Sequence, residues 1–305
     1  MYGVQAPTGA VGTDKDRGES ETLDNYQVKE EHKVLTRERP STENATSRSE
    51  VSVSFIDTLE GISEVIEALM NSPVTPPSIY IDLEGMNLGR EGPISIVQIF
   101  LYPQHHVYLV DVHTLGATAF DHAATTGKTL RSIFGSDGIP EVFFDVRNDS
   151  AAMFHQYQVE LAGIYDLQVM EVVTRARPGN YLAGLAKCIS RDAPMTPSEK
   201  ASWRATKERG KTLFSPQHGG SYKVFNARPL SREVVEYCVQ DVQFLPRLWQ
   251  TYSRALNPTL RQKVQAEVRN RIVLSQSPQF NGKGINMVLA PQISETKTEC
   301  PSSWL

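Results

Sequence analysis

Three apolar segments follow one another closely between residues 78 and 112, and they restrict the fold of this chain more than any other feature. They are Ser78 to Leu83, Ile94 to Leu101 and Val107 to Val112. Each combines β-branched and aromatic residues, which is typical of strands. Parallel neighbours need a crossover of a dozen or more residues, so links this short fit an antiparallel meander.

The segments on either side alternate between strand and helix patterns. Val51 to Phe55 reads as a short strand, and Asp57 to Glu60 caps a helix that ends at the prolines of residues 73–77. Beyond the meander, the apolar run Glu141 to Val146 predicts another strand. Helices are expected over a stretch ending near Phe134, over Asp149 to Tyr157, Asp166 to Arg175 and Leu182 to Ile189, and from Thr196 and Ser231 onward. This order indicates an α/β or α+β layered domain.

The two ends of the chain differ from this middle part. Residues 1–50 hold few large apolar side chains and no sustained period, which predicts a disordered tail. The segment 257–305 carries one amphipathic helix pattern, from Leu260 to Ile272, and then a polar end. We therefore expect a folded domain over residues 51–256 with a tail at each end.

The composition favours an intracellular protein, nuclear or cytoplasmic. The 3 cysteines are scattered without a Cys-x-x-Cys pair, so they support neither a disulfide framework nor a thiolate metal site. No apolar run approaches the roughly 20 residues of a membrane span. The first residues also lack the layout of a secretory signal.

The formal net charge of −4 conceals a separation of charge along the chain. Residues 51–170 contain 4 basic against 15 acidic residues, whereas residues 171–232 contain 12 basic against 4 acidic residues. Such asymmetry says more about partners than the total does. It leaves room for a cation site in one part of the chain and a polyanion site in another.

An Asp-x-Glu pair interrupts the first strand of the meander. Side chains alternate across a strand, so Asp82 and Glu84 share one face, about 7 Å apart at their backbones. Repulsion and desolvation disfavour two such carboxylates in an apolar strand, and a divalent cation would resolve that conflict. An exposed edge strand with solvated acids is the alternative, and the pair alone does not decide between them.

Two further candidates lie at the ends of later elements. Asp149 follows an apolar strand at the start of a helix, where it is either a ligand or a helix cap. Tyr237 and Asp241 are four residues apart and share one helical face beside the apolar stripe of that helix. A hydrogen-bonded surface pair is the alternative for these two. Pro246 is expected to kink or end the helix just beyond them.

In this order the motifs resemble the DEDD 3′-5′ exonucleases, in the tyrosine-bearing subclass that includes ribonuclease D and the Werner-syndrome exonuclease. The resemblance covers about residues 51–256, and it is strongest to the exonuclease 3′-5′ domain-containing proteins, whose second motif has the form of Asp145 to Ser150. Tyr165 to Gln168 and Arg228 to Leu230 also match. The resemblance implies a ribonuclease H-like three-layer α/β fold, with a mixed sheet of an antiparallel meander plus parallel strands between helices.

The resemblance also implies site residues and a reaction. Asp82, Glu84, Asp149 and Asp241 would hold two divalent cations, Mg²⁺ or Mn²⁺, and Tyr237 would orient the attacking water. The implied activity is hydrolysis of phosphodiester bonds from the 3′ end of single-stranded RNA or DNA. Two positions depart from the family pattern: Phe144 replaces a common His, and residues 224–227 lack a common Trp. Asp145 and Asp166 are expected to be structural or to support the ligands.

A basic segment with interleaved aromatic residues separates the second and third acidic motifs. Cations there can contact phosphates while aromatic rings stack on unpaired bases. The candidate substrate-binding residues are Lys200, Arg204, Lys207, Lys211 and Arg228. Ordinary surface charge is the alternative for this run. A nucleic-acid adaptor with the same fold and little or no turnover remains the alternative to the enzyme.

Overall fold

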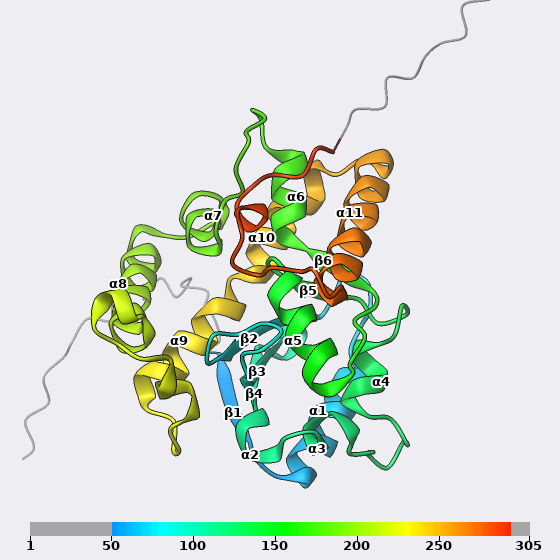
Figure 1. Cartoon of the computed structure of the whole chain (residues 1–305), viewed down its shortest axis with the longest axis vertical. Coiled ribbons are helices and arrows are strands. Elements are labelled where there is room, and N and C mark those ends of the chain that lie inside the picture. Colours follow the sequence, from blue (N-terminus) through cyan, green and yellow to red (C-terminus); the bar gives the residue numbers. More distant parts are fainter. Residues whose placement is uncertain (1–50, 294–305) are drawn as a thin grey trace, which may run out of the picture. The chain divides into compact units, whose positions relative to one another are not determined.

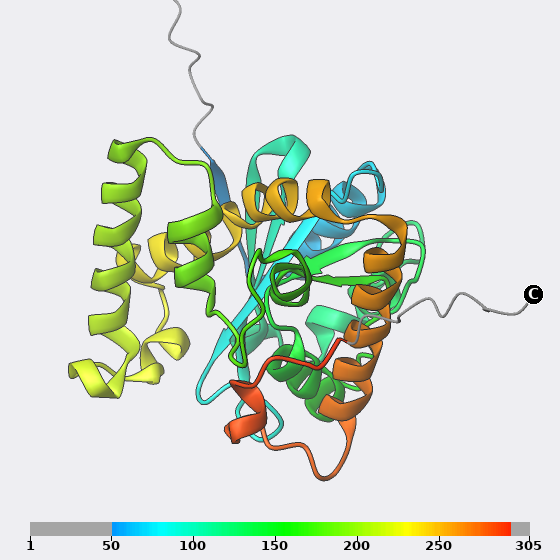
Figure 2. The ribbon, with the colours of Figure 1, turned by 90° about the horizontal axis from the view of Figure 1, so that it is seen from above.

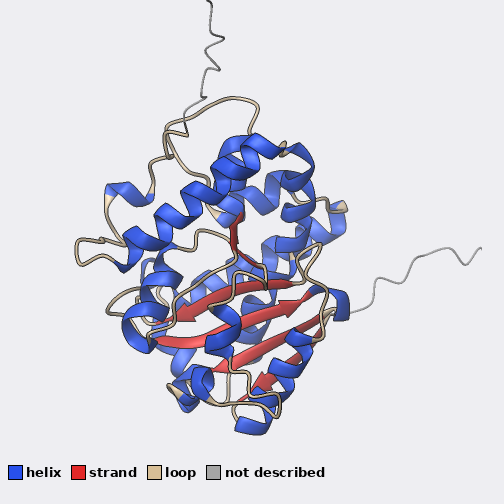
Figure 3. Cartoon of the chain, turned by 90° about the vertical axis from the view of Figure 1, so that its right-hand side faces the viewer, coloured by secondary structure: helices blue, strands red, loops and turns tan. Residues whose placement is uncertain are grey.

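A computed structural model describes residues 51–293 of the chain. A single six-stranded sheet runs through this part in the order β1-β4-β3-β2-β5-β6, with helices on both of its faces (Figures 1 and 3). This is the α/β fold with a mixed sheet that the sequence predicts. The tail predicted for residues 1–50 and the polar end beyond residue 293 lie outside the described residues.

The predicted meander forms the middle of the sheet. Strands β2 (Ile79–Gly85), β3 (Ile94–Leu101) and β4 (His106–Asp111) pair antiparallel in sequence order. All eight residues of β3 are buried, as expected for a central strand covered on both faces. Strand β1 (Ser52–Ile56) joins the far side of β4 in parallel.

Two short parallel strands extend the sheet beyond β2. Strand β5 (Glu141–Phe143) pairs with β2, and β6 (Ile164–Asp166) pairs with β5. The sequence predicts β5 with three further residues, but it does not predict β6. With three residues, β6 has no room for an alternating pattern, and only its pairing with β5 identifies it as a strand.

Helices surround the sheet, and most of them begin at a cap visible in the sequence. Thr58, Thr196 and Ser231 each accept a hydrogen bond from the first turn of the helix that follows. The helices are α1 (Leu59–Met70), α2 (Val112–Leu115), α3 (Thr118–Asp121), α4 (Leu130–Phe134), α5 (Arg147–Tyr157), α6 (Leu167–Thr174), α7 (Leu185–Asp192), α8 (Pro197–Phe214), α9 (Arg232–Gln243), α10 (Leu245–Ala255) and α11 (Pro258–Gln276). Short 3₁₀ helices span Tyr102–Gln104, Pro216–His218, Tyr222–Asn226 and Ile285–Met287.

Three helices matter most for the site. Helix α9 packs against β2, β3 and β4, and α8 packs against α9 on the side away from the sheet (Figure 2). The predicted break at Pro246 is present, because α9 ends at Gln243 and α10 begins at Leu245. Helix α11 packs against α5, α6 and β6, with Val264 and Val268 buried.

Candidate active site

Strand β2 brings two carboxylates to one face of the sheet. Asp82 pairs with Gln98 and Glu84 with Ile96 across the β2–β3 ladder. The register shifts between Glu84 and Gly85, and a Cβ on Gly85 would lie 2.1 Å from the carbonyl oxygen of Pro93. Only glycine permits this close approach, so Gly85 fixes the turn directly after Glu84.

Helix α9 completes a group of three carboxylates. Asp82, Glu84 and Asp241 can each offer an oxygen such that the three atoms lie within 4.8 Å of one another. Asp241 is buried, and the two strand residues are half-buried. Residues 159 positions apart in the chain thus meet at one point. Carboxylate oxygens at this spacing suit a hard divalent cation.

The fourth predicted ligand, Asp149, lies in the first turn of α5 and is buried. It does not belong to the group of three. Its pKa is raised by burial and further by the negative charge of Asp82, so the two side chains share an electrostatic environment. Asp149 thus lies beside the group of three and forms no part of it.

Lys207 enters this acidic site from α8. Its ammonium nitrogen lies 2.6 and 2.8 Å from the two oxygens of Asp241 and 3.1 Å from the Tyr237 hydroxyl. It also lies 4.5 Å from the centre of the Tyr237 ring. The sequence predicts Lys207 as a phosphate contact on a surface helix, whereas the structure buries it against a predicted ligand.

Burial and mutual repulsion shift the titration of the strand carboxylates. Removal from water and the charge of Asp241 raise the pKa of Asp82 to about 7, although Lys207 opposes the shift. Removal from water, with the charges of Asp82 and Asp241, raises the pKa of Glu84 well above its usual range. One ammonium group therefore does not balance the negative charge collected here.

Tyr237 is held in a tight aromatic setting beside Asp241. Its ring centre lies 4.9 Å from that of Phe214 and 6.4 Å from that of Phe225. A Cβ on Gly210 of α8 would lie 2.2 Å from the ring, so the two helices touch at this point. Burial, followed by the charge of Asp241, raises the pKa of the Tyr237 hydroxyl. Tyr237 is therefore a neutral hydroxyl with a fixed position.

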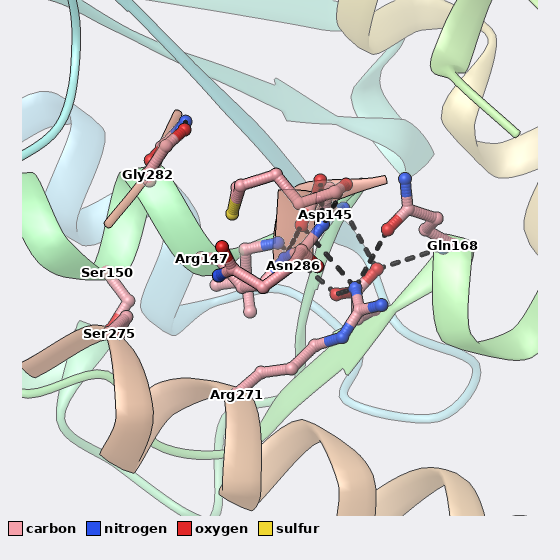
Figure 4. Close-up of polar contacts among 12 residues, drawn as sticks. Asp145, Arg147, Ser150, Gln168, Arg271, Ser275, Gly282 and Asn286 are labelled. Atoms are coloured by element: carbon pink, nitrogen blue, oxygen red, sulfur yellow. Dashed lines mark hydrogen bonds and ion pairs between the residues drawn. The ribbon is translucent and has the colours of Figure 1, made fainter. Parts of the chain in front are cut away.

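Asp166, together with Asp145, which is labelled with its partners Arg147 and Arg271 in Figure 4, organises the turn that leads to Asp149. Asp166 accepts hydrogen bonds from the backbone N–H groups of Asp145, Val146 and Gln168. Arg271 of α11 donates to Asp166 at 2.8 Å and lies 3.4 Å from Asp145. Asp145 has a φ of 63°, a strained value for a residue with a side chain, and these contacts hold it there.

The other predicted cations have different surroundings. Lys211 pairs with Glu208 on the surface of α8, and Lys200 donates to the carbonyl of Ser190. Arg228 pairs with the buried Asp111, with 2.7 Å from Nε to Oδ2. Arg204 is exposed on α8. The structure therefore brings only Lys207 of these five into contact with the carboxylate site.

One buried polar side chain near the site is absent from the sequence prediction. Gln98 lies opposite Asp82 in the ladder, and within the described residues neither atom of its amide group has a hydrogen-bond partner. A glutamine inside the apolar run of residues 94–101 was the available signal. Nothing in the sequence signals that Lys207 would be buried in the site, because cations are common on a helix with a polar surface.

A cleft of about 960 Å³ adjoins Glu84, one of the predicted ligands. Glu84 lies in its wall, together with residues 85–93 of the β2–β3 turn, Asn148 and Tyr222. Residues from the far end of the chain, between Pro278 and Lys283, close another side. The cleft thus combines aromatic, cationic and amide groups next to the group of three carboxylates.

Comparison with known proteins identifies the motif-bearing part of the chain. Residues 53–257 match the protein family described as 3′-5′ exonuclease. The piRNA biogenesis protein EXD1 of Xenopus laevis is 27% identical over 218 residues, which are 70% of this chain and 45% of that protein. EXD1 of Mus musculus is 30% identical over 95 residues, 31% of this chain and 15% of that protein. The chain spans less than half the length of these curated relatives.

Solved structures share the fold. The Trypanosoma brucei RNase D in complex with the RNA U12 has a TM-score of 0.60 and 22% identity, covering 76% of this chain and 74% of that one. The catalytic core of RRP6 from the same organism has a TM-score of 0.53 and 18% identity, covering 74% and 55%. At these identities the two structures bear on the fold alone.

Proposed function

Because this chain belongs to the DEDD 3′-5′ exonuclease family, with its ribonuclease H-like fold, we propose that it is a metal-dependent 3′-5′ exonuclease of single-stranded nucleic acid. The observation that carries the proposal is the meeting of Asp82, Glu84 and Asp241 within 4.8 Å, from a strand and a helix far apart in sequence. A solvated edge strand would not produce such a group.

The residues present fit a divalent cation. The pKa values of Asp82, Glu84 and Asp149 are all raised, so these groups need positive charge to ionise together near neutral pH. Within residues 51–293, Lys207 is the only cation in an ion pair with any of the four predicted ligands. Asp82, Glu84 and Asp241 would hold one cation, and Asp149 with Asp82 would hold a second. When bound, two such ions stabilise charge on the attacking and leaving oxygens of a phosphodiester.

The side chains around the carboxylates have separate tasks in this proposal. The Tyr237 hydroxyl, held by Lys207 and by its aromatic neighbours, positions the attacking water. Lys207 holds the Asp241 carboxylate in place, because its ammonium group contacts both oxygens of that side chain. Arg204, exposed on α8, is the candidate contact for the phosphate backbone of the strand.

Within residues 51–293, no helix has the length and apolar character that crossing a membrane requires.

The test is cleavage of matched RNA and DNA strands labelled at the 5′ end, with Mn²⁺ or with chelator. The proposal expects a ladder of products shortened from the 3′ end that disappears with chelator. Asp82→Asn should abolish the ladder while the thermal unfolding midpoint remains close to that of the wild type. Glu60→Gln, an exposed acid on α1, is the matched control and should cleave normally. A fully active Asp82→Asn protein would refute the site.

Lys207 favours a second candidate, an adaptor that binds single strands without cleaving them. Its ammonium group already neutralises Asp241, so the site has an internal counter-ion. In this case the labelled strand is retained but not shortened under any metal condition. The Lys207→Met variant distinguishes the two candidates further, since the exonuclease should lose cleavage with the contacts to Tyr237 and Asp241, whereas an adaptor has no cleavage to lose.

A further inference from the structure

The segment 277–290 follows α11 and lines the cleft beside Glu84, and we name it the C-terminal strap. It leaves the end of α11, passes the β2–β3 turn and then runs toward the loop before α7 (Figure 2). The match to the exonuclease family ends at residue 257, so the strap lies outside it. The family match therefore does not account for the strap.

Contacts at three points hold the strap in place. At its start, Arg90 of the β2–β3 turn donates to the carbonyl of Pro278 at 3.0 Å. In its middle, Arg147 donates to the carbonyls of Asn286 and Met287, both at 3.0 Å. At its end, the N–H of Leu182 donates to the carbonyl of Val288 at 2.9 Å. The strap is thus fixed along its length by backbone carbonyls.

The middle contact links the strap to the turn that carries Asp149. Arg147 is buried and also pairs with Asp145, so its two carbonyl contacts belong to the network of Figure 4. A Cβ on Gly282 would lie 2.2 Å from Oδ1 of Asn148, the residue next to Asp149. The same Cβ position is 3.4 Å from the ring of Phe280. The Phe280 ring therefore lies near the Asn148 side chain, in the first turn of α5.

Phe280 and Lys283 face the same cleft as Glu84. The cleft wall also contains Tyr222, and its volume of about 960 Å³ is enough for a nucleotide. Aromatic rings stack on unpaired bases of any sequence, and a lysine ammonium contacts phosphate. In a duplex only the outer face of a terminal base pair is exposed, and the partner strand must enter with it, whereas an unpaired base can enter the cleft alone.

We propose that the strap supplies the binding site for the 3′-terminal nucleotide of a single strand, with Phe280 stacking on its base and Lys283 contacting a phosphate. This inference rests on the proposed function for its choice of ligand. Phe280 is then a specificity-determining residue, since it selects unpaired over paired 3′ ends. Tyr222 provides a second aromatic surface within the same cleft.

The experiment compares binding and cleavage by the full chain carrying Phe280→Ala, Phe280→Tyr or Lys283→Gln. Affinity for a fluorescent single-stranded oligonucleotide is measured by anisotropy in chelator, where no turnover occurs. Loss of one stacked base corresponds to about 1–3 kcal/mol, so Phe280→Ala should weaken binding about 5- to 150-fold. Phe280→Tyr should retain the wild-type affinity. Lys283→Gln should reduce the slope of log K against log salt by about 0.7.

The matched control is Ile285→Ala, because Ile285 belongs to the same strap, is 70% exposed and does not line the cleft. It should bind like the wild type. With Mn²⁺, Phe280→Ala should raise KM in the same proportion and change kcat by less than about twofold. A blunt duplex should bind the wild type weakly and show no response to Phe280→Ala.

The outcomes separate this inference from the proposed function. Unchanged affinity of Phe280→Ala, equal binding of duplex and single strand, or absence of binding by the wild type would overturn the inference. If the wild type cleaves and Phe280→Ala has an unchanged KM, the exonuclease remains and the strap site fails. If nothing cleaves but Phe280→Ala loses affinity, the exonuclease fails and the strap site remains.

Discussion

At the scale of single residues, Lys207 adds a positive charge to the group of acidic side chains. Motif spacing predicts that Asp82 and Glu84 share a strand face and that Asp241 shares a helix face with Tyr237, whereas the meeting of these acids is implied only by the family resemblance. Neither spacing nor resemblance predicts that Lys207, named as a phosphate contact, reaches Asp241 from a neighbouring helix. That reach depends on how α8 packs on α9, which no local pattern encodes.

Replacing Lys207 with Met should destabilise the protein in chelator by about 3–5 kcal/mol, because the buried Asp241 loses its only ion-pair partner within residues 51–293. Adding Mn²⁺ should recover part of this loss, because a bound cation replaces the ammonium charge. Urea unfolding with and without metal measures both effects. Lys211→Met on the same helix is the control and should change stability by less than about 0.5 kcal/mol, since its pair with Glu208 is largely exposed. Equal stability of both variants would contradict the role of Lys207.

Glu141 provides a test of buried charge outside the site. It lies in β5, is fully buried, and neither of its carboxylate oxygens has a hydrogen-bond partner within the described residues. Burial raises its pKa well above the usual range. The folded protein therefore keeps this proton at pH values where the unfolded chain has released it, and stability must fall as the pH rises above about 4.5.

Glu141→Gln should remove this pH dependence, because the amide has the same shape and does not ionise. The stability of the variant relative to the wild type should increase by up to about 1.4 kcal/mol per pH unit as the pH rises from about 5 to 8. Chemical unfolding across that range provides the measurement. Glu160→Gln, at an exposed position, should track the wild type. A constant difference between Glu141→Gln and the wild type would mean that Glu141 is ionised in the folded protein.

At the scale of elements, the contact between α8 and α9 sets the position of Tyr237. Sequence patterns predict both helices and their caps, because Thr196 and Ser231 carry local signals. They do not predict that Gly210 is the contact point, since an isolated glycine in a helix has several possible reasons. Strand β6 is missed for a similar reason, because its three residues acquire their identity from pairing with β5.

Gly210→Ala should destabilise the protein by about 1–3 kcal/mol, although alanine is the better helix former. The added methyl group would lie 2.2 Å from the Tyr237 ring and would force α8 and α9 apart. In a Tyr237→Ala background the same substitution should instead stabilise by about 0.5–1 kcal/mol, because the ring is gone and only helix propensity remains. A double-mutant cycle by thermal or chemical unfolding gives the coupling. Equal effects in both backgrounds would show that the helices do not meet there.

At the scale of the whole molecule, the part of the chain beyond the family match contributes to the centre of the fold. Arg271 of α11 pairs with the fully buried Asp166, and Ser275 lies 2.9 Å from Ser150 of α5. The amphipathic pattern of α11 is visible in the sequence, but its partners are not. The position of the strap is still harder to predict from the sequence, because Arg147 and Arg90 hold it through backbone carbonyls, which every residue has.

Two truncations separate these contributions. A chain ending at residue 257 should fail to fold, because it leaves Asp166 buried without Arg271 and uncovers the surface of α5 and β6 against which Val264 and Val268 pack. A chain ending at residue 276 keeps α11 and should show a cooperative thermal transition, with reduced affinity for single strands because the strap is missing. Circular dichroism melting and oligonucleotide binding measure the two effects. A cooperative transition in the shorter chain would show that α11 is dispensable, and full affinity in the longer one would remove the strap from the binding site.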